Sequence, residues 1–93
     1  MGTRGRMRQR KLPKKLKAIR EALGYSQNEV IAALGLEGLR QSNISGYELG
    51  RIEPPISVLL AYCEAVNICA DVLLDDRYEL PKDLPRKKTF HPH

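Results

Sequence analysis

Residues that end helices occur at short intervals along the chain and divide it into brief apolar segments. Gly24, Gly35 and Gly50 each follow an apolar helical period, and Pro54 and Pro55 prevent the third segment from continuing. No segment between these stops has the alternating pattern that is typical of a strand. The sequence therefore predicts an all-α domain built from short helices joined by tight turns.

The first two helices are marked by apolar periodicity and by a capping box. In the first helix apolar residues recur at intervals of four, three and four, namely Leu12, Leu16, Ile19 and Leu23. Ser26 and Glu29 have the spacing of a capping box that opens the second helix. Its buried side is expected to contain Val30, Ile31 and Leu34. A connection through residues 36–38 then leads to a third helix, which starts near Arg40.

A fourth helix is expected from Ser57, and a short fifth helix covers about 70–74. Ser57 is a suitable N-cap, and Asn67 suits the left-handed turn that ends the fourth helix. The inward-facing residues are predicted to be Leu59, Leu60, Cys63 and Val66. Ninety-three residues support one domain. We predict a compact five-helix domain over 12–76, between an N-terminal arm at 1–11 and a polar tail at 77–93, neither of which is expected to be ordered alone.

The third helix has an unusual polar face. Ile44 and Tyr47 are three residues apart and so point the same way. The opposite face carries short or hydrogen-bonding groups from Gln41, Ser42, Ser45 and Gly46, and no charge lies between Gln41 and Tyr47. Neutral amides and hydroxyls suit the edges of DNA bases, where Gln can bond adenine at two positions. An ordinary polar helix face is the alternative that this segment alone leaves open.

Positive charge is concentrated in the first fifth of the chain. Residues 1–20 carry nine Lys and Arg and no acid, whereas residues 21–80 carry three bases and ten acids. A basic arm on an acidic body is typical of nucleic-acid-binding proteins, and a solvated tail is the alternative. The candidate phosphate contacts are the arm residues Arg4, Arg6, Arg8, Arg10 and Lys11, followed by Lys14 and Lys15.

The sequence lacks the residue patterns of metal-binding, catalytic and phosphate-loop proteins. Cys63 and Cys69 lie six apart in an apolar segment without further metal ligands, so we expect buried, reduced thiols. His91 and His93 stand in the tail, away from any Ser or Cys nucleophile, and there is no Gly-rich phosphate loop. We expect no catalysis, metal or cofactor. Residues 1–20 contain no apolar core of a signal peptide, and the run at 56–61 is too short to cross a bilayer, so we expect a cytoplasmic protein.

The chain resembles the lambda-repressor/Cro-like helix-turn-helix family, also called the xenobiotic-response-element family. The resemblance covers about 12–76 and rests on motifs in the family order: Ser26-Gln27, Leu34-Gly35, Ile44 to Arg51, Pro54, Leu60, Ala65 to Ile68 and Leu73-Leu74. It implies a five-helix fold whose second and third helices form the helix-turn-helix. Members are mostly bacterial and phage transcription regulators that bind double-stranded DNA as dimers.

The resemblance also implies roles for single residues. Gln41 and Ser42 match positions that reach base edges, and Ser45 and Gly46 match later groove-facing positions. Candidate backbone contacts are Gln27, which also braces the recognition helix, Asn43 and Arg51. Arg40 is a further candidate that departs from the family, because it occupies the usual Ser/Thr cap position. Arg20 and Glu48 match a partly buried ion pair between the first and third helices.

Three further features depart from the family pattern. Three extra residues lie between Gly35 and Ile44, so either the turn is longer or the second helix continues. Ile31 stands where a small Ala is usual, which implies a wider helix crossing. Gly46 has no side chain at a base-reading position and costs roughly 1 kcal/mol of helix stability relative to Ala.

We therefore expect a sequence-specific DNA-binding transcription regulator, a repressor, that reads the major groove with the helix near 41–49. A homodimer through 68–74 is expected, because Ile68, Val72, Leu73 and Leu74 exceed what one side of so short a helix can bury. The alternative is that all four residues belong to the core and that assembly occurs elsewhere or not at all. A protein-interaction module on the same fold, such as an antitoxin or adaptor with a protein partner, is the alternative. RNA binding is less favoured, since one Phe and four Tyr offer little stacking surface.

Overall fold

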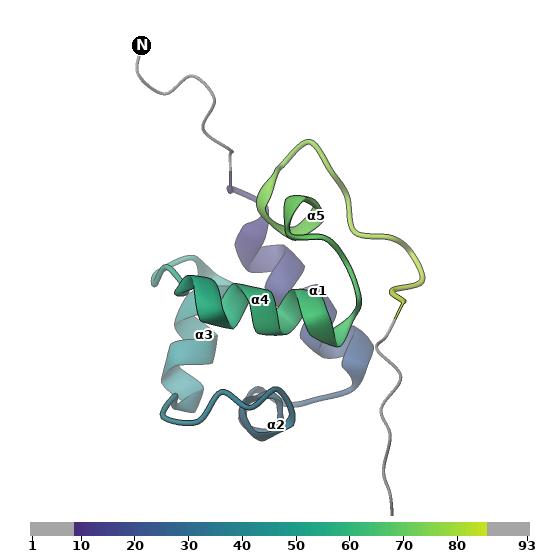
Figure 1. Ribbon diagram of the computed structural model, residues 1–93. Helices are drawn as coiled ribbons and strands as arrows, with labels where there is room; N and C mark the ends of the chain where they lie inside the picture. Colours follow the sequence, from purple (N-terminus) through teal and green to yellow (C-terminus); the bar gives the residue numbers. More distant parts are fainter. Residues whose placement is uncertain (1–8, 86–93) are drawn as a thin grey trace, which may run out of the picture.

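The computed structural model describes residues 9–85, which form five helices joined by short turns (Figure 1). The helices are α1 (Leu12–Leu23), α2 (Gln27–Ala33), α3 (Gln41–Leu49), α4 (Ile56–Ala65) and α5 (Ala70–Leu74). No strand occurs in this range. The predicted all-α, five-helix fold is confirmed.

A single core joins the helices. α3 packs against α1 and α2, and α5 packs against α1 and α4. The largest fully buried side chains come from all five helices and from the turn after α4: Leu16, Ile19, Val30, Ile44, Tyr62, Val66 and Leu73. The apolar period of α1 is thus buried as its spacing predicts, and α1 ends at Gly24, which has a left-handed φ of 81°. The capping box of Ser26 and Glu29 opens α2.

The turn between α2 and α3 contains the three additional residues. α2 ends at Ala33, and the turn runs over 34–40 before α3 begins. Gly35 and Gly38 both adopt positive φ, which lets the chain reverse without a Cβ clash. Leu36 from this turn is buried in the core. The extra residues therefore lengthen the turn and do not extend α2. Leu36 fixes this turn to the core.

Two details predicted for α4 are wrong. The helix begins before Ser57, at Ile56, with extended Pro55 at its N-cap and no side-chain cap. Leu60 is 52% exposed, and Val58 and Tyr62 are buried instead. The helix is apolar on most sides, so its pattern alone did not distinguish the inner face. Asn67, by contrast, has the expected left-handed φ, of 54°. The two cysteines are free, but only Cys63 is buried, so the prediction for exposed Cys69 is wrong.

The short helix α5 is a core element. Leu73 is fully buried, and Ile68 and Leu74 are partly buried against the core. Leu80 and Leu84, in the predicted tail, also pack against this cluster. The surplus apolar surface predicted around α5 is therefore largely used within the molecule. The division of the chain at residues 11 and 76 stays a prediction.

Lys15 is buried under the end of α5, which contradicts its predicted role in binding phosphate. Its Nζ donates hydrogen bonds to the carbonyl oxygens of Val72 at 2.7 Å and Asp75 at 3.1 Å. Removal from water lowers the pKa of this ammonium group. A buried cation near the C-terminal carbonyls of a helix is favourably placed, so Lys15 joins α1 to α5 and is not available to DNA.

Candidate nucleic-acid interface

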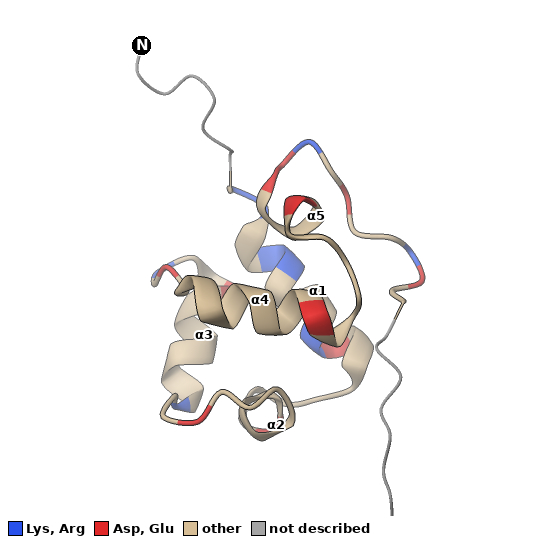
Figure 2. Cartoon of the chain, viewed as in Figure 1, with Lys and Arg blue, Asp and Glu red and all other residues tan. Residues whose placement is uncertain are grey.

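The outer face of α3 is exposed and almost uncharged. Ile44, Tyr47 and Glu48 point inward and are buried. Gln41 and Ser42 are exposed, and Ser45 is half-buried. Figure 2 shows α3 mostly without charged residues, in contrast to the mixed charges around α1 and the segment after α5. The structure thus brings three of the four predicted base-reading residues to one open surface.

Gly46 lies on the same outer face but is covered, so its predicted base contact is wrong. It follows Ser42 by four residues, which places both on one side of the helix. The side chain of Ile52 lies over it, and a Cβ added at Gly46 would stand only 2.7 Å from Ile52 Cγ1. The absence of a side chain at this position therefore serves close packing by the following turn.

The start of α3 is fixed by its own backbone and by Asn43. Arg40 occupies the N-cap with extended backbone angles, and its N–H donates to Oδ1 of Asn43 at 2.9 Å. Asn43, at the third position of the helix, therefore satisfies the backbone N–H of the N-cap residue in this structure. The side chains of Arg40 and Arg51 are exposed, and neither forms an ion pair with any residue in 9–85. Both guanidinium groups lie at the surface, near the two ends of α3.

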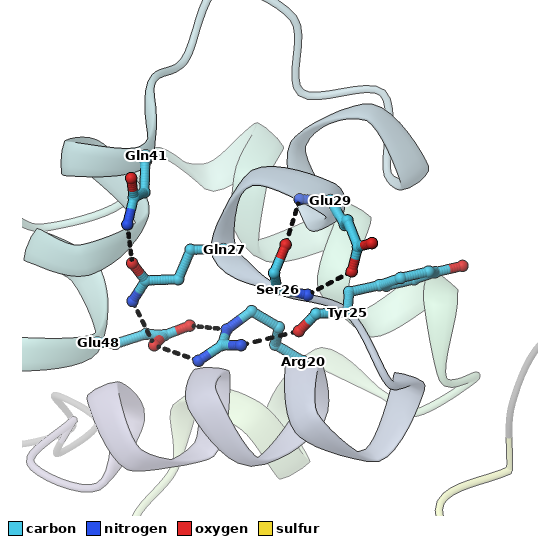
Figure 3. Close-up of polar contacts among 7 residues, drawn as sticks. All are labelled: Arg20, Tyr25, Ser26, Gln27, Glu29, Gln41 and Glu48. Carbon is cyan, nitrogen blue, oxygen red and sulfur yellow. Dashed lines mark hydrogen bonds and ion pairs between the residues drawn. The ribbon is translucent and has the colours of Figure 1, made fainter.

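A chain of side-chain hydrogen bonds ties the front of α3 to the helices behind it (Figure 3). Gln41 Nε2 donates to Oε1 of Gln27 at 3.1 Å, and Gln27 Nε2 donates to Oε1 of Glu48 at 3.1 Å. Because Gln27 belongs to α2, one amide bridges the exposed and buried faces of α3. The Gln41 amide is consequently held at the surface by a residue that is itself fixed.

The inner end of this chain is an ion pair with little solvent exposure. Arg20 donates to both carboxylate oxygens of Glu48, from Nε at 2.7 Å and from Nη2 at 3.0 Å. Its Nη1 donates to the carbonyl of Tyr25 at 2.8 Å. The hydrogen bond with Glu48 raises the pKa of Arg20. The contact ties α1 to α3, and through Tyr25 to the turn before α2, so α3 is held in place by the elements behind it.

The basic arm is described only at its inner end. Arg4, Arg6 and Arg8 lie outside the described residues. The backbone N–H groups of Arg10 and Lys11 donate to the carboxylate of Asp76, both at 3.0 Å. Lys11 Nζ also pairs with Glu79 at 2.7 Å on the surface. Since exposed pairs contribute little, a phosphate can compete for this ammonium group. Lys14 is exposed.

The described residues do not gather the ligands of a metal centre. Within 9–85 no three His, Cys, Asp or Glu side chains form a group that can hold a metal ion. No helix in this part of the chain is long and apolar enough to cross a membrane.

Two short helices joined by a turn, with the first bracing the second and the second presenting an uncharged outer face, are the arrangement of a helix-turn-helix protein. A family model described as helix-turn-helix matches residues 16–71. The chain belongs to this family, which is the lambda-repressor-like, xenobiotic-response-element type. No curated protein and no solved structure matches the chain. The family is one of DNA-binding regulators.

Sequence reasoning missed two residues of this surface. Leu49 and Ile52 are 60% and 43% exposed. Ile52 lies over Gly46, and Leu49 follows Gly46 by three residues on the same helical face. The available signal was Gly46 itself. A glycine on a helix face leaves space that the side chain of a residue from another segment can occupy. The position of that residue depended on how the chain turns after Gly50.

Proposed function

We propose that this protein is a sequence-specific regulator of transcription that places α3 in the major groove of double-stranded DNA. The observation that carries the proposal is the bridge from Gln41 through Gln27 to Glu48. It fixes an exposed amide at the first turn of α3, on the uncharged outer face of that helix. The N-terminal residues of a recognition helix are the ones that reach base edges in this class of protein.

Gln41 has the free groups that adenine recognition needs. One hydrogen of its Nε2 is engaged by Gln27. The other hydrogen and Oε1 can meet N7 and the N6 amino group of adenine, which is the usual two-point pairing of a glutamine. Ser42 is exposed beside it and can donate to or accept from a neighbouring base. Ser45, one turn on from Gln41, extends the same stripe.

Phosphate binding is proposed to come from charges that surround α3. Arg40 precedes the helix and Arg51 follows it, so the two can contact the backbone on either side of the groove. Lys14 and the arm add positive charge, which an acidic body otherwise lacks. Gln27 has both ends of its amide engaged, so we assign it the bracing of Gln41 in preference to a phosphate contact.

We propose repression as the regulatory effect, and a homodimer as the bound form, in the cytoplasm of a bacterial or phage-infected cell. Occupying an operator is sufficient to block transcription and needs no second activity. One recognition helix reads too few base pairs for a genome, whereas two copies read half-sites about 34–36 Å apart. The dimer surface expected at α5 stays a prediction: Leu73 is buried and Ile68 and Leu74 pack on the core, whereas Val72 is half-buried and outside the core cluster.

Selection of bound sequences from random duplex DNA tests the function. We expect a preferred half-site, with binding that weakens steeply as salt rises. Ser42→Ala should change the preferred sequence, while Ser57→Ala, an exposed serine on α4, should not. Recovery of random sequences, or a tight protein partner whose binding is unaffected by duplex DNA, would contradict the proposal and favour the protein-interaction alternative.

A further inference from the structure

The turn after α3 folds back over the outer face of the helix. Gly50 ends α3 with a left-handed φ of 76°. The N–H groups of Arg51 and Ile52 then both donate to the carbonyl oxygen of Gly46, at 2.9 and 3.2 Å. These two hydrogen bonds to one carbonyl oxygen hold the backbone of Ile52 near Gly46. The Ile52 side chain fills the space that a side chain at Gly46 would need.

Ile52 and Leu49 consequently form an apolar surface beside the polar residues of α3. Leu49 follows Gly46 by three residues and Gly46 follows Ser42 by four, so all three share one helical face. Leu49 is 60% exposed and Ile52 is 43% exposed. The recognition face thus has two parts, a polar one at Gln41 and Ser42 and an apolar one at the end of the helix.

We propose that Ile52, with Leu49 beside it, contacts the C5-methyl groups of thymines and sets a thymine preference next to the bases read by Gln41 and Ser42. The inference rests on the proposed function and deepens it. The thymine methyl is the apolar group that the four standard bases present in the major groove. The charged neighbours of Ile52, Arg51 and Glu53, have opposite signs, so this turn adds no net charge that would hold it away from the duplex.

Replacing thymine by deoxyuridine tests this contact, because it removes the methyl group and leaves the hydrogen-bonding edge intact. Each thymine of the selected duplex is replaced in turn. The wild-type protein should lose about fourfold in affinity at one or more positions, the equivalent of one methyl group left unburied. Ile52→Ala should bind the thymine and deoxyuridine duplexes at those positions with closely similar affinity. Leu60 is an exposed apolar residue on α4, and Leu60→Ala is the matched control. This variant should keep the wild-type ratio of affinities for the thymine and deoxyuridine duplexes.

The outcomes separate this inference from the function beneath it. Equal wild-type affinity for every substituted duplex of a selected site overturns the thymine contact and leaves sequence-specific binding standing. No preferred duplex at all overturns both. An Ile52→Ala variant that keeps the full deoxyuridine penalty assigns the methyl contact to another residue. Loss of self-association in Ile52→Ala, without any deoxyuridine effect in the wild type, assigns the surface to a protein contact. The wild-type scan and the surface variant Leu49→Ala keep the test decisive if Ile52→Ala does not fold.

Discussion

Arg20 of α1 meets Glu48 of α3 through two hydrogen bonds, with 11% and 4% of the two side chains exposed. Removing one partner leaves the other charge in a poorly solvated place. We expect Glu48→Ala to lower the free energy of unfolding by about 3 kcal/mol. Urea denaturation measures this, and a double-mutant cycle with Arg20→Ala isolates the pair. A coupling energy near zero would refute the pairing, even with two destabilised single variants.

Gln27→Ala is expected to weaken specific DNA binding although Gln27 makes no predicted base contact. The change frees the Gln41 amide from its support at 3.1 Å. Gln41→Ala itself should cost about 1–3 kcal/mol at one base position and relax the preference there. Competition with single-base variants of the selected site measures both effects. Because the residues act together, the double variant should lose less than the sum of the single losses.

Strictly additive losses for Gln27→Ala and Gln41→Ala would show that Gln27 acts by a separate contact. Equal loss on specific and random duplexes would remove Gln41 from the base-reading set. Ser57→Ala is the control for both measurements, because Ser57 is an exposed residue on α4.

The salt dependence of binding reports the phosphate contacts. Deleting residues 1–8 removes Arg4, Arg6 and Arg8. If all three bind phosphate, the slope of log affinity against log salt should shrink by roughly 3, and Arg51→Ala should shrink it by about 1. Lys82→Ala, an exposed residue after α5, should leave the slope unchanged. An unaltered slope in the deletion would mean that the arm does not touch DNA.

Acid stability is expected to depend on the segment after α5. Hydrogen bonds from Arg77 lower the pKa of Asp75 from 3.8 to about 2. A lowered carboxyl pKa means that the unfolded chain binds the proton first. The stabilisation is therefore complete above pH 3.8 and is lost as pH falls toward 2. Arg77→Ala should remove part of this pH dependence, and denaturation curves between pH 6 and 2 measure it. Parallel curves for the two proteins would show that the contact has no role.

The features that the sequence predicted correctly are local ones. The period of Leu12, Leu16 and Ile19, the capping box at Ser26 and the turn at Asn67 each depend on a few adjacent residues. The polar face of α3 was likewise visible from spacing, and the partner of Glu48 came from the family resemblance.

The features that were missed depend on residues far apart in the chain. Lys15 is buried because the carbonyl groups of Val72 and Asp75 lie above it, which no pattern near Lys15 indicates. Leu60 faces outward while Val58 and Tyr62 are buried, and this depends on the direction in which Pro55 starts α4. Ile52 covers Gly46 only because the turn at Gly50 returns along the helix.

Tyr62 is fully buried, and its hydroxyl has no hydrogen-bond partner among the described residues. An unpaired buried hydroxyl is unfavourable, so Tyr62→Phe should leave stability unchanged or raise it at neutral pH. Burial also raises the pKa of Tyr62 from 10.0 to about 12. Between these values the unfolded chain releases the proton and the folded one keeps it, so stability falls as pH rises. The wild type should lose on the order of 2 kcal/mol by pH 12 through this group. Tyr62→Phe should lack that loss, while Tyr78→Phe, an exposed control, should retain it. A Tyr62→Phe variant that is clearly less stable at pH 7 would show that the hydroxyl is satisfied in solution.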